Sequence, residues 1–333
     1  MIAVAIVNYR TTDATLDCLR ALIAGTSANV RIHVLDNGSG HDAVVALQTF
    51  CDNNDRIQLS LSETNLGFAA GMNRLFTEVL ADASIDDIVL LNSDTIPTPG
   101  FIDTMHAQLD RARRIDLVAA RMLVANEGGV DSLGITLFRS TLASNRKLDE
   151  EKLLGPSGGC ALLTRRLLED LKATHGECFD ESFFCYAEDT DLAARARWLG
   201  YTPAYASGAV VHHARSLSSG GPDNDFVLYH GIRNSLWWLI KNAPLAWFLR
   251  SLPWFCALHI GIIVRHVRRG RGRVVWRLYR DAIKGIGAMR RKRAVIRETR
   301  RVAASEFASW VEPRFYQRDY VRRAWRELFR PNR

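Results

Sequence analysis

The sequence lacks the short motifs that mark several common classes of protein. Its six cysteines are scattered and none forms a CxxC pair, which disfavours a zinc site or a thioredoxin-like redox site. It contains no GxxxxGK[ST] motif, and the segment NLGFAAG does not make GxGxxG, so neither a P-loop nor a dinucleotide-binding Rossmann site is expected. The N-terminus, MIAVAIVNYR, has no basic leader and no cleavage site. We therefore expect no targeting segment, reduced thiols and a cytoplasmic location.

The length and composition are those of an ordinary globular protein. The chain has 333 residues, of which 47% are hydrophobic and 24% charged, which excludes wholesale disorder, collagen and a small disulfide scaffold. Its charge is unevenly divided: residues 231–333 hold 25 Lys plus Arg against 6 Asp plus Glu, leaving 19 basic and 30 acidic side chains in residues 1–230. We therefore predict an enzymatic body, 1–230, and a basic extension, 231–333, that docks on an anionic surface.

Strand and helix patterns alternate over the first ninety residues. Apolar runs predict strands and helical spacing predicts helices, in the order strand 2–8, helix 11–24, strand 30–35, helix 43–50, strand 57–61, helix 68–80 and strand 87–91. This alternation predicts a mostly parallel sheet with helices on both faces. Ligands of such sheets bind at the carboxyl ends of the strands, so the residues after each strand are the first candidates for a site.

Three of the predicted strands end in polar clusters: Asn8-Tyr9, Asp36-Asn37-Gly38-Ser39 and Asn92-Ser93-Asp94. Asx and Gly residues also make ordinary turns, and for any single cluster that explanation is equally good. Three clusters on one edge of a sheet favour a shared pocket. A strand-end carboxylate there could hold a divalent cation, which would neutralise a diphosphate.

Five acidic residues crowd one segment beside aromatic rings. From Phe179 to Tyr201 the chain reads FDESFFCYAEDTDLAARARWLGY, with a helix predicted from Thr190 to a stop at Gly200. Acids near a helix N-terminus commonly cap it, which accounts for one of the five. Crowded carboxylates near apolar rings should have raised pKa values, which suits a general base. Upstream, GPSGGC at 155–160 offers backbone NH groups and close approach.

Eight segments, in order along the chain, resemble the motifs of one enzyme family: VAIVNY, LDNGS, NLGFAAGMN, LLNSDT, GPSGGCALLTRR, FFCYAEDTDLAARARWLGY, VVHHARSLS and YHGIRN. By these motifs the sequence resembles a family 2 glycosyltransferase of the GT-A fold, and most of all the bacterial rhamnosyltransferase-like branch. The resemblance implies an α/β nucleotide-diphospho-sugar transferase fold over residues 1–230. No motif covers the last hundred residues, and we predict helices for the extension.

The resemblance also implies a donor pocket and a metal site. Eight residues would line the nucleotide and donor pocket: Asn8, Tyr9, Asp36, Asn65, Gly67, Asn73, Asn92 and Ser93. Asn92-Ser93-Asp94 stands where the family has its Asp-x-Asp metal motif, although it begins with Asn. Asp94 would then be the principal carboxylate ligand of Mg²⁺ or Mn²⁺, with His212 or His213 as a further ligand.

Catalytic roles follow in the same way. Asp189, in the family's Glu-Asp pair, would be the catalytic base, and Glu188 would orient it. Gly158, Gly159 and Asp191 would support the acceptor side of the site. The implied reaction is inverting transfer of a sugar, L-rhamnose by the branch resemblance, from a dTDP-, UDP- or GDP-linked donor. The implied acceptor is a glycan or a lipid-linked glycan of a surface polysaccharide or glycolipid.

The extension begins with an apolar segment rich in tryptophan. Residues 235–264 contain Trp237, Trp238, Trp247 and Trp254, but their longest uncharged stretch, 251–264, has only 14 residues and includes Pro253. A spanning helix needs about 20 residues, so none is predicted. The tryptophans suit either a membrane interface or packing against the catalytic body.

A strongly basic run follows: residues 265–301 hold 15 basic and 2 acidic side chains. Such a run beside an aromatic segment favours attachment to anionic lipid, peripheral on the inner face of the cytoplasmic membrane. A solvated helical face is the alternative, and nucleic-acid binding lacks any recognisable module, so no nucleic-acid partner is predicted. A non-catalytic binding protein on a degenerate GT-A scaffold is the other alternative, and the acids Asp94, Glu188 and Asp189 argue against it.

Overall fold

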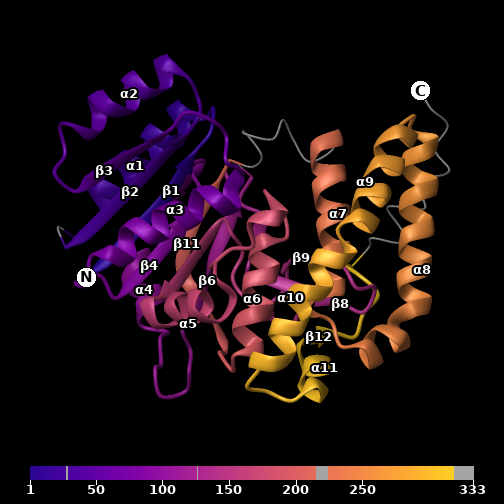
Figure 1. The fold of residues 1–333 in the computed structure, drawn as a ribbon. Helices are drawn as coiled ribbons and strands as arrows, with labels where there is room; N and C mark the ends of the chain where they lie inside the picture. The colour runs from indigo at the N-terminus through magenta and orange to yellow at the C-terminus, as the bar shows by residue number, and fades with distance from the viewer. Residues whose placement is uncertain (28, 126, 215–223, 319–333) are drawn as a thin grey trace.

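A computed structural model describes residues 1–27, 29–125, 127–214 and 224–318. A layered α/β body forms the N-terminal part, and long helices at the C-terminal end stand beside it (Figure 1). The strands are β1 (Ile2–Asn8), β2 (Val30–Asn37), β3 (Ile57–Ser62), β4 (Asp87–Leu91), β5 (Thr95–Pro97), β6 (Leu117–Val124), β7 (Val130–Ser132), β8 (Ile135–Phe138), β9 (Ala143–Asn145), β10 (Cys160–Thr164), β11 (Pro203–His213) and β12 (Val311–Glu312).

The helices are α1 (Thr12–Gly25), α2 (His41–Cys51), α3 (Gly67–Ala81), α4 (Phe101–His106), α5 (Arg165–His175), α6 (Glu188–Trp198), α7 (Asp225–Asn242), α8 (Leu245–Arg268), α9 (Gly272–Lys284), α10 (Ile286–Thr299) and α11 (Phe307–Trp310), with short 3₁₀ turns at Glu181–Phe183 and Ala304–Glu306. The predicted strands 2–8 and 87–91 match β1 and β4, and the other predicted elements differ by one or two residues at their ends. The predicted boundary at residue 230 lies inside α7.

The main sheet has the order β3-β2-β1-β4-β10-β6-β11-β5, with β7 beside β6. β1 pairs in parallel with β2 and β4, and β2 pairs in parallel with β3. The carboxyl ends of these strands therefore meet at one edge. β10, whose CALLT side chains are all buried, runs antiparallel to both β4 and β6. The predicted parallel order is confirmed for β1 to β4, as are the helices on both faces, while the sheet as a whole is mixed.

Apolar helix faces cover both sides of this sheet, because strands buried on both faces need a helical layer on each. On one side α3, α5 and α6 contribute Phe76, Leu168 and Leu192 to a single buried cluster. On the other side α1 and α4 contribute Leu19 and Phe101 to a second cluster. The helix that carries the acidic segment is thus fixed against the sheet.

A third apolar cluster joins the C-terminal helices to the body. It combines α6, α7, α10 and α11 with the small sheet β12-β8-β9. Trp238 is 1% exposed in it, and Trp237 and Trp247 pack against it, whereas Trp254 is 40% exposed. Packing against the body is therefore confirmed for three of the four tryptophans, and a membrane-interface role stays a prediction.

The basic extension also uses part of its charge inside the molecule. Lys241 pairs with Asp180 and Asp191, and Arg301 pairs with Asp170. Further pairs between the extension and the body are Lys292–Glu177, Arg314–Glu151 and Arg318–Glu150. The basic extension was expected to dock on an anionic surface outside the protein. For these residues that expectation is corrected, because their partners are acidic side chains of the body.

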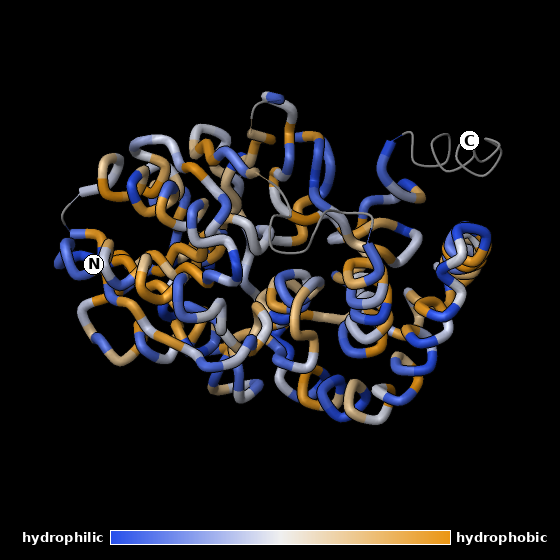
Figure 2. Tube along the Cα trace, turned by 90° about the horizontal axis from the view of Figure 1, so that it is seen from above, coloured by the Kyte–Doolittle hydropathy of each residue, from blue (hydrophilic) through white to orange (hydrophobic). Residues whose placement is uncertain are grey.

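α8 differs from the other C-terminal helices. It continues through Pro253 without a break. Among the residues that the structure describes, α8 is the one helix long and apolar enough, by length and composition, to cross a membrane, and 22% of its most apolar window is buried. Seen from above, α8 stands end-on at the edge of the molecule, away from the main sheet (Figure 2).

Candidate active site

A cavity of about 1040 Å³ opens at the carboxyl edge of the parallel strands. Tyr9 follows β1, Asn37 ends β2, and Asn92, Ser93 and Asp94 follow β4, and all five line this cavity. The three polar clusters at the strand ends therefore share one pocket.

Asn8 and Asp36 lie behind this lining. Both are fully buried, and Asn8 Nδ2 donates to Asp36 Oδ1 at 2.8 Å. Asn8 Oδ1 accepts hydrogen bonds from Thr11 and Thr15, and Asp36 Oδ2 accepts one from the Ser39 amide. The two residues expected to contact the nucleotide thus form a buried polar network that fixes the loop presenting Tyr9.

The NLGFAAGMN segment contributes two of its three candidates to the lining. Asn65 Oδ1 accepts from Asn37 Nδ2 at 3.1 Å and from the Gly67 amide at 2.8 Å, and both Asn65 and Gly67 line the cavity. Gly67 has φ +82°, and a Cβ there would lie 2.5 Å from Phe184 Cδ2, so only glycine fits. Asn73 lies elsewhere: its amide bonds the backbone NH and carbonyl of Phe179.

Asp94 and His213 form the polar centre of the cavity. His213 Nε2 lies 3.1 Å from Asp94 Oδ1, and its Nδ1 lies 2.6 Å from Asp131 Oδ2. All three line the cavity, whereas His212, on the next position of β11, does not. The structure thus distinguishes the two histidines. It also adds Asp131, which sequence reasoning missed because only the pairing of β7 and β11 with β6 brings it there.

These residues fit a divalent cation. Two ligands bound at right angles at Mg²⁺ distances lie about 3 Å apart, close to the measured separation of Asp94 Oδ1 and His213 Nε2. Metal-binding histidines usually donate their other ring NH to a carboxylate, which is the place that Asp131 takes. Within the described ranges no cluster of three or more His, Cys, Asp or Glu side chains could hold a metal by itself. The protein would supply two ligands, as is usual for Mg²⁺ bound together with substrate phosphates.

A proton and a cation compete for Nε2 of His213. Burial lowers the pKa of His213, but the hydrogen bonds to Asp131 and Asp94 outweigh burial and raise it to about 9. The site therefore attracts a positive charge beside Asp94. A bound cation would take the place of the proton at Nε2.

Glu188 and Asp189 begin α6 and line the same cavity. The Gly158 amide donates to Asp189 Oδ2 at 2.8 Å, and the Thr190 amide donates to Oδ1 at 2.6 Å. A Cβ on Gly158 would lie 3.5 Å from Asp189, and one on Gly159 would lie 2.4 Å from Met122 Cε. The close approach that requires a glycine is therefore that of Gly159 to Met122, whereas Gly158 acts through its backbone amide; both glycines line the cavity.

Burial raises the pKa of both acids. For Glu188 the loss of solvent is the main cause and the charge of Asp189 adds to it, so its pKa is well above the usual value. The pKa of Asp189 is also raised by burial, although the hydrogen bonds from Gly158 and Thr190 oppose the shift. The expectation of raised pKa values in this segment is confirmed for these two, and an ionised Asp189 can accept a proton from a bound hydroxyl.

The turn that leads into α6 has an unusual backbone. Phe184, Tyr186 and Ala187 all have positive φ, between 66° and 68°, which is costly for residues other than glycine. Asn234 of α7 donates through Nδ2 to the carbonyls of Phe183, Cys185 and Tyr186 at 2.7–2.8 Å. The YHGIRN segment therefore holds this turn in place, a function that the sequence did not indicate.

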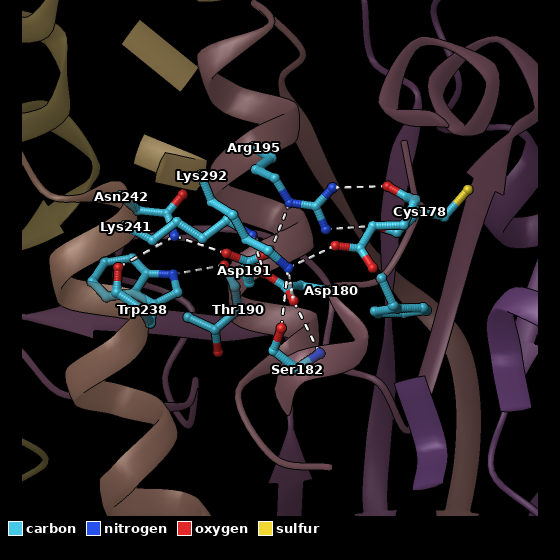
Figure 3. A network of polar contacts seen from close by, with 12 residues as sticks. Cys178, Asp180, Ser182, Thr190, Asp191, Arg195, Trp238, Lys241, Asn242 and Lys292 are labelled. Carbon is cyan, nitrogen blue, oxygen red and sulfur yellow. Dashed lines mark hydrogen bonds and ion pairs between the residues drawn. The ribbon is translucent and has the colours of Figure 1, made fainter. Parts of the chain in front are cut away.

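Asp191 points away from the cavity into a buried ionic network, which Figure 3 shows with Lys241 between two carboxylates. Lys241 Nζ lies 2.7 Å from Asp180 and 2.8 Å from Asp191, and Arg195 Nε lies 2.7 Å from Asp191. Lys292 also pairs with Asp180. Burial alone would raise the pKa of both aspartates, but the charge of Lys241 outweighs burial and lowers it. The raised pKa expected for the acidic segment is therefore wrong here: these acids connect α6 to α7 and α10.

The pocket lies where α/β sheets bind their ligands, and comparison with known proteins identifies the class of enzyme. A model of glycosyl transferase family 2 matches residues 3–172, just over half of the 333-residue chain. The chain therefore belongs to glycosyl transferase family 2, and the predicted enzyme class is confirmed. The match is to the family as a whole, so the rhamnosyltransferase-like branch stays a prediction. No curated protein matches the sequence.

Solved structures share the fold. GalNAc-T7 with UDP, GalNAc and Mn²⁺ is 14% identical with a TM-score of 0.59, over 79% of this chain and 51% of that one; this chain thus spans about half of its length. The mannosyltransferase PcManGT of Pyrobaculum calidifontis, with GDP-Man and Mn²⁺, is 14% identical with a TM-score of 0.54, over 90% and 85% of the two chains. S. aureus TarS 1–349 with UDP-GlcNAc is 14% identical with a TM-score of 0.52, over 94% of this chain and 93% of that one. These likenesses confirm the GT-A fold.

Proposed function

We propose that this protein transfers a sugar from a nucleoside-diphosphate donor to an acceptor hydroxyl with inversion at the anomeric carbon. The observation that carries this proposal is the presence of Asp94, His213 and Asp189 on the walls of one cavity. A donor diphosphate bound beside Asp94 and His213 would place its sugar in the space that Asp189 also faces. GT-A relatives of known structure bind UDP, UDP-GlcNAc or GDP-Man, which supports the same donor class here.

Each residue has a physical role in this reaction. Asp94 and His213 would hold Mg²⁺ or Mn²⁺, which supplies charge stabilisation to the departing diphosphate. Asp131 orients His213, and Tyr9, Asn65 and Gly67 shape the donor pocket. Asp189 accepts the proton of the acceptor hydroxyl as its oxygen bonds to the anomeric carbon and the bond to the diphosphate breaks. Burial raises the pKa of Glu188 well above its usual value, whereas the hydrogen bonds from Gly158 and Thr190 favour the ionised form of Asp189.

A donor panel tests the proposal. The thermal stability of the protein is measured with dTDP-rhamnose and the common UDP- and GDP-sugars, each with and without Mg²⁺ or Mn²⁺. Ligand at about 100 times its Kd adds about 2.7 kcal/mol to the free energy of unfolding. A metal-dependent shift with one nucleotide class is expected and names the donor, with L-rhamnose as the predicted sugar. Absence of any shift, together with absence of donor hydrolysis, would instead support a non-catalytic protein on this scaffold.

We further propose that the enzyme works as a peripheral protein on the inner face of the cytoplasmic membrane, on a glycan or lipid-linked acceptor. One face of α8 carries an exposed apolar stripe at helical spacing, formed by Leu245, Leu249, Leu252, Cys256, Ile260, Ile263 and Val267. The opposite face is packed on the protein through Leu258 and Ile262. A helix that is apolar outward on one side only suits the plane of a membrane interface rather than a span.

Vesicle flotation tests this attachment, with phosphatidylcholine vesicles containing about one fifth phosphatidylglycerol. The L249E/I260E variant is expected to lose flotation, because it places charges on the stripe. The matched control is V45E/L61E, which changes two apolar residues of similar exposure on the catalytic body. Equal flotation of both variants would contradict the proposed surface.

A further inference from the structure

Three aromatic side chains form one wall of the cavity. Phe184 and Tyr186 belong to the turn before α6, Phe226 belongs to α7, and all three line the cavity. The ring centroid of Phe226 lies 6.4 Å from that of Phe184 and 6.2 Å from that of Tyr186. Phe226 is 39% exposed, although an aromatic side chain stabilises most when it is buried. The wall is therefore an apolar surface that a bound molecule could cover.

This wall adjoins both the donor pocket and the catalytic acids. A Cβ on Gly67 would lie 2.5 Å from Phe184 Cδ2, so the ring of Phe184 rests against a residue of the donor pocket. The turn that carries Phe184 and Tyr186 leads directly into Glu188 and Asp189, the first residues of α6. A molecule on the wall therefore lies next to the donor pocket and to Asp189, which is where an acceptor must bind.

α7, which carries Phe226, also leaves open space in the cavity. Gly231 and Ser235, one helical turn apart, both line it. A Cβ on Gly231 would meet no atom of the described residues within 4 Å. Glycine inside a helix is less favourable than alanine, and no close contact with the described part of the chain requires glycine here. The missing side chain thus provides room for a ligand on the cavity side of α7.

A buried acid of the same cavity favours a ligand with hydroxyl groups. Glu188 is 6% exposed and lines the cavity, and its Oε2 has no hydrogen-bond partner among the described residues. Buried polar atoms are normally hydrogen-bonded, so a bound hydroxyl group would supply the partner. His230 packs on Phe226 at 4.5 Å, and burial lowers its pKa to about 4, so it adds no charge to the wall near pH 7.

A pyranose sugar combines the two properties that these residues require. Its C–H bonds gather on one face of the ring, which suits the electron-rich face of an aromatic side chain. Its hydroxyl groups lie around the edge of the ring, within reach of an acid beside the wall. A fatty chain would cover the aromatic rings without supplying a hydroxyl group, and an acyclic polyol would supply hydroxyl groups without a fixed apolar face.

We propose that Phe184, Tyr186 and Phe226 form an acceptor subsite for a pyranose sugar. The C–H face of the sugar stacks on Phe226, and one of its hydroxyl groups reaches Asp189. The space beside Gly231 holds the adjoining part of the acceptor. This inference rests on the proposed function, because it names the acceptor class of that same site.

Saturation-transfer NMR on the full chain tests this subsite. The probes are the methyl pyranosides of glucose, galactose, mannose, rhamnose and N-acetylglucosamine, with sorbitol as an acyclic polyol, each in the presence of Mg²⁺ and UDP, GDP or dTDP. At least one pyranoside is expected to bind, with most of the saturation on the C–H protons of one ring face, whereas sorbitol is not. F226A removes the stacking surface and G231L fills the space, so each should weaken pyranoside binding by about tenfold.

Two matched controls accompany these variants. W254A removes an aromatic side chain of similar exposure, 40%, from outside the cavity lining. G287L adds the same side chain as G231L to α10, at a glycine whose Cβ would approach Arg291 Nη1 no closer than 3.8 Å. Both controls should bind the pyranoside as the wild-type protein does.

Three results would overturn the proposal. The first is the absence of pyranoside binding by a protein that still binds a nucleotide. The second is equal binding of sorbitol, or unchanged pyranoside binding by F226A. The third is a smaller thermal shift of F226A with sugar nucleotides but not with free UDP, GDP or dTDP, which would assign the wall to the donor sugar. Failure of the wild-type protein to bind any nucleotide is a different result, which contradicts the proposed function instead.

Discussion

Asp131 Oδ2 lies 2.6 Å from His213 Nδ1, although 82 residues separate them in the chain. The imidazole therefore presents Nε2 to Asp94 in a fixed orientation. Carboxylates that orient a metal-binding histidine typically contribute about 10–100-fold to metal affinity or activity. This relationship provides the first test of the cation site.

Asp131→Asn should weaken metal binding by about 10–100-fold, because it removes the charge that supports His213. The measurement is a Mg²⁺ or Mn²⁺ titration of the thermal shift produced by the donor nucleotide. His212→Asn is the matched control, since His212 lies outside the cavity lining, and it should leave the titration unchanged. The reverse pattern would move the metal ligand to His212.

Asn234→Ala should lower kcat more than it changes the KM for the donor. The substitution removes the donor to three carbonyls of the positive-φ turn, and each buried polar group left without a partner costs about 1–3 kcal/mol. The turn that positions Glu188 and Asp189 would loosen while the donor pocket stays. Steady-state kinetics measure kcat and the KM for the donor, and thermal unfolding measures the loss of stability. A loss of stability with unchanged kcat would make Asn234 structural only.

As pH is lowered, kcat/KM should begin to fall at a pH above the usual pKa of aspartate. Asp189 must be ionised to accept a proton, and burial raises its pKa, so activity falls as pH falls through that raised value. The hydrogen bond from Thr190 Oγ1 lowers the pKa of Asp189. Thr190→Val removes this bond, so the pKa of Asp189 should rise. The acid limb of the variant should therefore move to higher pH. A limb that stays in place would exclude Asp189 as the group that titrates.

Lys241→Met should destabilise the fold by up to about 3–5 kcal/mol, because it removes the cation shared by two buried carboxylates and leaves Asp191 only Arg195 and Asp180 only Lys292 as a cationic partner. Lys241 is 3% exposed between Asp180 and Asp191. The pKa of these acids would rise without Lys241, so the deficit should shrink as pH is lowered and they become protonated. Denaturant unfolding at several pH values measures it. Arg318→Met, which breaks an exposed pair with Glu150, should cost less than about 1 kcal/mol.

Local sequence patterns predicted most of the body. The continuous apolar runs of β1 and β4 predict strands that are buried on both faces, and the helical spacing of buried side chains specifies α1 and α3. The parallel order then brings the ends of β1, β2 and β4 together. The candidates Tyr9, Asp94 and Asp189 could be recognised from motifs alone, and all three line the cavity.

The remaining contributors depend on contacts that no local pattern encodes. Asp131 joins His213 only because β7 and β11 both pair with β6. Asn234 and Lys241 looked like ordinary polar positions of an apolar segment, yet α7 packs them against the acidic segment. Asp180 and Asp191 lie close in sequence to Glu188 and Asp189, so the sequence grouped all four acids together. In the structure Glu188 and Asp189 line the cavity, whereas Asp180 and Asp191 pair with Lys241.

Asp189→Asn tests the proposed base most directly. The substitution keeps the shape of the side chain and removes its capacity to accept the proton. Release of nucleoside diphosphate from the donor identified by the panel should fall by about 10²–10⁴-fold, while the metal-dependent thermal shift of that donor stays largely unchanged. Near-normal turnover by this variant would contradict the assignment and transfer the role to Glu188, the other acid of α6 that lines the cavity.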